Sequence, residues 1–183
     1  MELRSVKELM VPRAQYAVVS VDATLLEAIR TMEEAQKRAE SQQQPFRAVL
    51  VEDRNHNIVG KIGQLAFLKA LQPQRNILED KGKLASAGVS EQFISSVMDH
   101  YKFFQDNLSD LCARASGMNV KDVMHPVSES INEDATLGEA ISKIIEWESL
   151  SVLVKRGKDV VGLLRLSDVY QEIADYMKRI SNG

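Results

Sequence analysis

A pattern that occurs twice constrains the fold of this chain more than any other feature. Residues 6–29 read VKELMVPRAQYAVVSVDATLLEAI, and residues 120–141 read VKDVMHPVSESINEDATLGEAI. The offset between the copies is 114 residues at the Val-Lys opening and 112 at the DATL segment, so the first copy holds two extra residues between these points. Because an internal repeat marks a structural unit used more than once, the chain is predicted to contain two similar units.

Each copy is predicted to fold in the order strand, helix, strand, strand, helix. Thr24 with Glu27, and Thr136 with Glu139, have the spacing of a capping box, in which the threonine and the glutamate satisfy backbone N–H groups at the start of a helix. Short apolar runs on both sides of a polar turn then predict a β-hairpin in each copy. The predicted strands and closing helices are 17–21, 46–51, 58–62 and 64–71 in the first copy, and 151–154, 160–164 and 167–180 in the second.

Residues 72–119 belong to neither copy and are predicted to form a helical insertion. Its main helix is expected to start at Ser90 and to place an apolar stripe, with Phe93 and Phe104, on one face. Cys112 is interpreted as a small core residue of this insertion. The stripe must pack on the repeats or on a second chain.

The bulk composition is that of an ordinary soluble protein. Of the 183 residues, 44% are hydrophobic and 27% are charged, and the formal charge of −3 provides no overall field for nucleic acid or an anionic membrane. No apolar run approaches the roughly 20 residues that cross a bilayer. The single cysteine excludes an internal disulfide framework. We therefore expect a cytoplasmic protein that binds neither nucleic acid nor membrane.

The residues give no sign of catalysis or of a metal site. His56, His100 and His125 lie far apart in the sequence and fit no metal-ligand spacing. No glycine-rich phosphate loop and no catalytic triad is recognisable. We expect a protein that is not an enzyme, requires no cofactor and holds no metal.

The ordered set of motifs resembles a tandem pair of cystathionine-β-synthase (CBS) domains. The matching features are the two Met-x-Pro openings, the DATLLEAI and DATLGEAI segments, and the hairpins that contain IVG and VVG. The resemblance implies an α/β (α+β) fold in which two β-α-β-β-α repeats, residues 1–71 and 120–183, pack about a pseudo-two-fold with the insertion 72–119 between them. It also implies a regulatory role, a homodimer, and adenosine-containing ligands in the clefts between the repeats.

The ligand signature of that family is Gly-aliphatic-aliphatic-Ser/Thr-x-x-Asp, which leads from the last strand into the last helix of a repeat. Residues 162–168 read GLLRLSD, so the resemblance places the ribose-binding carboxylate at Asp168, with Ser167 and the first helix amides near phosphate. Arg165 stands where the family has Ser/Thr; its guanidinium suits phosphate oxygens but could instead block the cleft. In the first copy Ala66 replaces the aspartate. At most one good adenosine site is therefore expected, in the cleft served by the second repeat.

Further ligand contacts are implied by position alone. Around the adenine, the candidates are Val127 and Ser128 after the second opening, and Val152 and Val161 on the second hairpin. An interpretation without a ligand is open for the two charged residues, because Asp168 also suits the dipole at a helix start and Arg165 also suits a solvated surface.

Two functions follow from this sequence. One is a stand-alone regulatory sensor that binds AMP, ADP, ATP or S-adenosylmethionine and transmits occupancy to an unidentified downstream protein, through different affinities for two arrangements of the repeats. The other is a ligand-free dimeric interaction or scaffold module, whose contact surface is the apolar stripe of the insertion.

Overall fold

Among the residues that the structure describes, the first repeat contains four strands and three α-helices. The computed structural model of the chain describes residues 3–38, 47–71 and 108–181. In order, the elements of the first repeat are α1 (Val6–Leu9), β1 (Val11–Pro12), the 3-10 turn η1 (Arg13–Gln15), β2 (Val18–Ser20), α2 (Leu25–Arg38), β3 (Ala48–Glu52), β4 (Ile58–Gly63) and α3 (Gln64–Ala70).

The helix α6 (Leu108–Ser116) lies at the end of the insertion and precedes the second repeat, which follows the same order as the first. The elements of the second repeat are the 3-10 turn η2 (Val120–Asp122), β5 (His125–Pro126), β6 (Ser130–Asn132), α7 (Leu137–Glu146), β7 (Ser151–Arg156), β8 (Asp159–Arg165) and α8 (Leu166–Ser181). The predicted order of strand, helix, strand, strand, helix is confirmed in both copies, and so is the mixed fold with two sheets.

Both predicted capping boxes form. The N–H of Thr136 donates to the carboxylate of Glu139 at 2.8 Å, and the N–H of Glu139 donates to Oγ1 of Thr136 at 3.2 Å. The equivalent distances for Thr24 and Glu27 are 2.7 Å and 3.3 Å. Two otherwise orphan N–H groups are thus satisfied at the start of each helix, which fixes where α2 and α7 begin.

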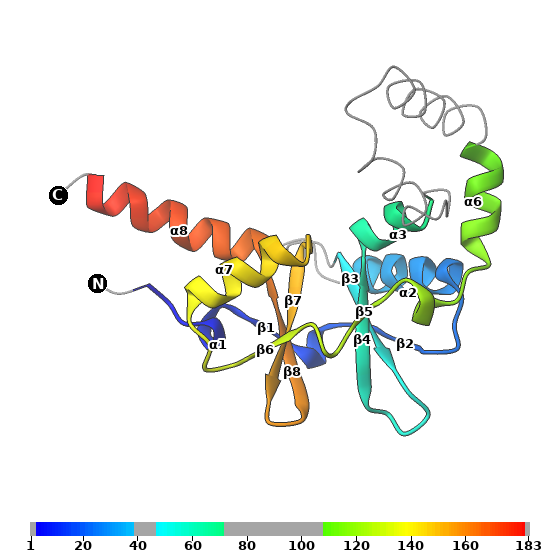
Figure 1. Cartoon of the computed structure of the whole chain (residues 1–183), viewed down its shortest axis with the longest axis horizontal. Coiled ribbons are helices and arrows are strands. Elements are labelled where there is room, and N and C mark those ends of the chain that lie inside the picture. Colours follow the sequence, from blue (N-terminus) through cyan, green and yellow to red (C-terminus); the bar gives the residue numbers. More distant parts are fainter. Residues whose placement is uncertain (1–2, 39–46, 72–107, 182–183) are drawn as a thin grey trace, which may run out of the picture.

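The two sheets exchange their outermost strands between the repeats (Figure 1). One sheet has the order β2-β3-β4-β5 and the other β1-β8-β7-β6. The strand β1, which opens the first repeat, pairs with β8 of the second, whereas β5, which opens the second repeat, pairs with β4 of the first. Each repeat therefore completes the sheet of its neighbour, and the units that pack in space differ from the repeats in sequence.

The exchange explains why a glycine recurs in both hairpins. A Cβ at Gly162 would lie 2.5 Å from the carbonyl oxygen of Val11, and a Cβ at Gly60 would lie 2.6 Å from that of His125. These distances are below van der Waals contact, so only glycine allows the exchanged strand to approach this closely.

Three apolar cores hold the structure together. One lies under α7 and α8 and includes Val6 and Leu9 of the first opening segment. A second lies under α2 and α3 and includes Val120 of the second opening segment. The third lies between the two sheets, with Leu50, Leu153 and Leu163 fully buried. Figure 1 shows the helices on the outer sides of the two sheets.

Met10 and Met124 occupy equivalent positions in the two Met-x-Pro openings. Both are partly buried, and each packs in the core of the opposite repeat. The methionines thus follow the exchanged strands.

The insertion is described only at its C-terminal end. Within α6, Leu111 and Ala115 are buried, and the helix contacts α2. Cys112 is exposed, so the expectation of a core cysteine was wrong. It follows the buried Leu111 and is turned by about 100° around the helix axis from it, which brings its side chain to the exposed edge of α6. The predicted helix from Ser90 and its stripe lie outside the described residues. None of the helices that the structure describes has the length and apolar character of a membrane-spanning segment.

Candidate functional site

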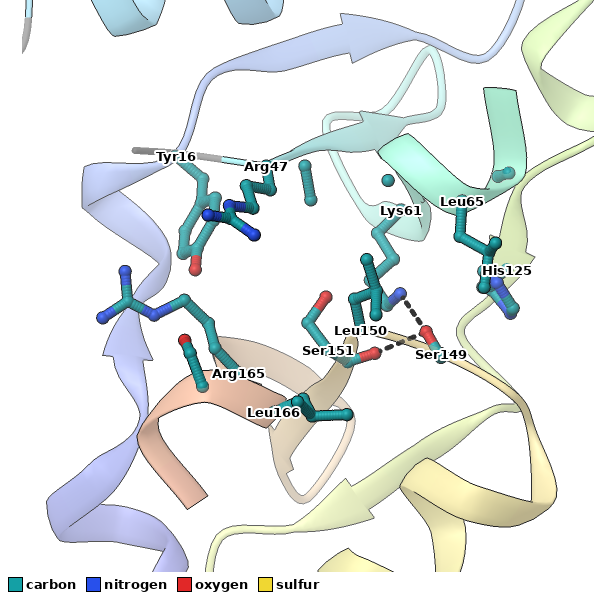
Figure 2. Close-up of a pocket in the computed structure, with 14 residues that line it drawn as sticks. Tyr16, Arg47, Lys61, Leu65, His125, Ser149, Leu150, Ser151, Arg165 and Leu166 are labelled. Carbon is teal, nitrogen blue, oxygen red and sulfur yellow. Dashed lines mark hydrogen bonds between the residues drawn. The ribbon is translucent and has the colours of Figure 1, made fainter. Parts of the chain in front are cut away.

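A cleft lies between the two repeats, on the side of the sheets where α3 and α8 begin (Figure 2). It receives side chains from both halves of the chain, so no single repeat can form it. The lining residues that carry polar groups are Tyr16, Arg47, Lys61, His125, Ser149, Ser151, Arg165 and Ser167.

The cleft is rich in positive charge. Figure 2 shows Arg47 and Lys61 extending into the cleft from the first repeat, and Arg165 lies on the side of the second repeat. The guanidinium of Arg47 and the ammonium of Lys61 favour an anionic ligand, although the chain as a whole is slightly acidic. The guanidinium of Arg165 points away from Lys61 (Figure 2) and is paired with Asp168.

Arg165 and Asp168 form a closed ion pair at the start of α8. Nε of Arg165 donates to Oδ2 of Asp168 at 2.5 Å, and an Nη donates to Oδ1 at 2.9 Å. Both side chains are mostly shielded from solvent. The arginine that replaces the hydroxyl residue of the family signature thus binds the aspartate of the same signature in a bidentate manner.

The structure brings some of the expected site residues together. Arg165 and Ser167 line the cleft. Asp168 is not among the lining residues, but it forms an ion pair with Arg165. Ser128 is exposed and does not line it.

The three valines proposed to contact adenine lie in apolar cores. Val152 is fully buried and packs with Val161 under α7 and α8. Neighbouring residues of a strand face opposite sides of the sheet. Leu153 faces the interface between the two sheets, so Val152 faces the helices. Val127 packs against the central core, and its N–H donates to the carbonyl of Val59 at 2.8 Å. These placements correct the expectation that the three valines surround the Asp168 site.

The exchange of strands accounts for the misplacement of Val127 and Ser128. They follow β5, which runs along β4 of the first repeat and so away from β8 and Asp168. The segment that approaches Arg165 is η1 with Tyr16, which follows β1. The two extra residues of the first copy lie in this same segment, between β1 and β2.

Several cleft residues were not predicted from the sequence. Tyr16 is buried, and burial raises the pKa of its phenol to about 12, so the hydroxyl stays protonated at neutral pH. Arg47 stands just before β3. The one signal available beforehand was Lys61, a lysine within the otherwise apolar hairpin strand IVGKI.

Lys61 and His125 lie side by side on the antiparallel strands β4 and β5. Nζ of Lys61 donates to Oγ of Ser149 at 2.9 Å. Nδ1 of His125 lies 2.6 Å from a carboxylate oxygen of Glu129. Burial lowers the pKa of Lys61 to about 8, and burial likewise lowers the pKa of His125 from its ordinary value.

No metal-binding cluster is found within residues 3–38, 47–71 and 108–181, where no three His, Cys, Asp or Glu side chains gather in a suitable way. The guanidinium, ammonium, imidazole and hydroxyl groups that line the cleft can recognise charge and hydrogen-bonding groups.

Comparison with known proteins identifies the architecture. The CBS domain family matches residues 6–73 and 120–175, and no curated protein sequence matches the chain. The structure is similar to that of CBSX2 from Arabidopsis thaliana, with 19% identity, coverage of 97% of this chain and 99% of that one, and a TM-score of 0.57.

Two further solved structures support the same fold. One is CBSX2 in complex with AMP, with 19% identity, coverage of 93% and 97%, and a TM-score of 0.56. The other is a CBS-domain protein from Agrobacterium tumefaciens, with 14% identity, coverage of 92% of each chain and a TM-score of 0.57. At these identities the similarity establishes the fold alone. With the family matched over both repeats, this chain belongs to the CBS domain family, as a tandem CBS pair.

Proposed function

We propose that this CBS pair is a regulatory unit that binds an adenosine-containing ligand in the cleft between its repeats. The observation that carries the proposal is that Arg47 and Lys61 line one cleft, with Asp168 held at its edge by Arg165. The AMP complex of CBSX2, a protein of the same fold, supports an adenosine nucleotide as the first ligand to test.

Asp168 is proposed to accept hydrogen bonds from the ribose hydroxyls. Its two oxygens already accept from Arg165. A carboxylate has about four acceptor positions, so ribose hydroxyls can be accommodated beside the guanidinium. The Arg165 pair then orients the carboxylate, in the way that a supporting residue fixes the geometry of a binding group.

The direct test is isothermal titration with AMP, ADP, ATP and S-adenosylmethionine. We expect at least one of them to bind below millimolar concentration. Asp168→Asn keeps the shape of the side chain but removes its charge, and it should weaken that ligand by about tenfold or more, since hydrogen bonds to charged groups contribute roughly 1.5–3 kcal/mol. Asp175→Asn, on the same helix and paired with Lys178, is the matched control. Equal affinity in the Asp168 variant and the control would contradict the assignment of Asp168.

A dimeric interaction module is the second candidate, and exposed apolar residues of α8 favour it. Tyr170, Met177 and Ile180 are 69%, 60% and 64% exposed, and they recur at helical spacing along one side of the helix. Because a contiguous exposed apolar surface marks a contact site, we propose that α8 pairs with a second copy of the chain.

Mass measurement in solution tests this contact. The double variant Tyr170→Glu, Met177→Glu should convert a dimer into a monomer, whereas Gln171→Glu, on the polar side of α8, should leave the mass unchanged. A monomeric unaltered protein would refute the dimer.

A further inference from the structure

Lys61 is a buried cation at the floor of the cleft. Only 2% of the residue is exposed. Its ammonium donates to the hydroxyl of Ser149, and that hydroxyl donates in turn to the carbonyl of Ser151 at 2.7 Å (Figure 2). An ammonium group has three N–H donors, so the contact with Ser149 leaves capacity for further acceptors in the cleft.

The pseudo-symmetry of the fold shows that this cation is not required by the architecture. In the first sheet Lys61 pairs with Leu50, and in the second sheet Leu163 pairs with Leu153 at the equivalent place. Leu163 is fully buried in the core between the sheets. A leucine therefore satisfies the packing at this position, and the lysine must be explained in another way.

In the part of the chain that the structure describes, no carboxylate lies within ion-pair distance of Nζ of Lys61. Glu129 attracts the charge of Lys61 from farther away and acts to raise its pKa, but its carboxylate contacts His125. Asp168 is paired with Arg165. A buried charge without an opposite charge is strongly unfavourable, so an anion in the cleft would relieve the penalty.

We propose that Lys61 and Ser149 form an anion subsite for the phosphate groups of the nucleotide. This inference rests on the proposed function and makes it more specific. With the ribose at Asp168, the phosphates reach the part of the cleft formed by Lys61 and Arg47. The ligand class is then a 5′-phosphorylated adenosine, in preference to adenosine itself and to S-adenosylmethionine, whose 5′ substituent carries a sulfonium cation.

The preference for phosphate depends on the protonation of Lys61. The charged groups that face it are Arg47, His125, Glu129 and Arg165, with Lys69 farther away on α3. The arginines keep their charge at every relevant pH, and the lowered pKa of His125 leaves it neutral from pH 7 upward. Phosphate, with a second pKa of about 6, is already mostly in its doubly charged form at pH 7. Lys61, with a pKa of about 8, is therefore the group that changes charge between pH 7 and pH 9.

The experiment compares AMP, ADP, adenosine, S-adenosylmethionine and inorganic pyrophosphate by isothermal titration. We expect AMP and ADP to bind at least tenfold more tightly than adenosine. Lys61→Met should remove this preference while leaving the affinity for adenosine unchanged, and Lys121→Met, the same replacement at an exposed site, should change neither. In the unaltered protein, the affinity for AMP should fall by about tenfold from pH 7 to pH 9 if only protonated Lys61 binds phosphate.

The outcomes separate the two proposals. If adenosine and AMP bind equally and Lys61→Met changes neither, the anion subsite is refuted while adenosine binding stands. If pyrophosphate binds in a Lys61-dependent manner and no adenosine compound binds, the subsite stands and the adenosine function is refuted. Absence of binding for every probe overturns both.

Discussion

Replacing Lys61 with methionine should stabilise the ligand-free protein at neutral pH. Burial lowers the pKa of Lys61 from an ordinary 10.5 to about 8. At about 1.36 kcal/mol per pKa unit, the charged lysine destabilises the folded state by roughly 3 kcal/mol. Methionine has a similar length and no charge, and it forfeits the hydrogen bond of the ammonium to Ser149. A hydrogen bond to a charged group contributes roughly 1.5–3 kcal/mol. The expected net gain in the free energy of unfolding is therefore about 1 kcal/mol.

The pH dependence of this gain has a defined sign. The folded protein has the lower lysine pKa, so the unfolded chain binds more protons between about pH 8 and pH 10.5. The penalty for burying the charged lysine is fully present below pH 8 and absent above pH 10.5. The free energy of unfolding of the unaltered protein therefore rises across this interval. The advantage of Lys61→Met should therefore be largest at pH 7 and should have mostly disappeared by pH 10.

Urea unfolding followed by fluorescence provides the assay. Trp147 is the only tryptophan of the chain and packs against the core under α7 and α8. Unfolding free energies are compared for the unaltered protein, Lys61→Met and the surface control Lys121→Met, which should change stability by no more than about 0.5 kcal/mol. A destabilised Lys61→Met at pH 7, or a gain of the same size at pH 7 and pH 10, would refute the reasoning.

Two further predictions concern the fold. Gly162→Ala should destabilise the protein by about 1–3 kcal/mol in urea unfolding, because its Cβ would meet the carbonyl of Val11 at 2.5 Å. The control Gly138→Ala, at the exposed start of α7, should be neutral or stabilising by up to about 1 kcal/mol. Similar effects for both variants would argue against the close approach of β1. Thr136→Ala removes a capping box and should lower the free energy of unfolding by about 1 kcal/mol. If the midpoint temperature of unfolding, measured by calorimetry, is the same in the variant and in the unaltered protein, this cap contributes nothing to stability.

The local elements were predictable because their causes lie within a few residues. Thr136 and Glu139 start a helix through contacts three residues apart, and the repeat of such signals indicated two equivalent units. Asp168 was likewise proposed from its place in a short motif, and its ion pair with Arg165 joins residues only three positions apart.

The composition of the cleft depends on contacts that no local pattern contains. Because β1 and β5 exchange sheets, Tyr16 approaches Arg165, and Val127 follows β5 to the first repeat. The placement expected for Val127 assumed that a repeat folds upon itself. A match between two copies cannot reveal the exchange, since strands that pair within a repeat and strands that pair across repeats need the same alternation of residues.

By itself, the sequence determined the elements, their order and the existence of a second copy, since capping, turns and apolar periodicity act over short distances along the chain. It also marked the place where the copies differ, with Asp168 opposite Ala66. Only the tertiary structure decided which side chains share the cleft. The ammonium of Lys61 donates to Ser149, which lies 88 positions away along the chain. Lys61 becomes buried, and its pKa is lowered, only once the two sheets have packed together.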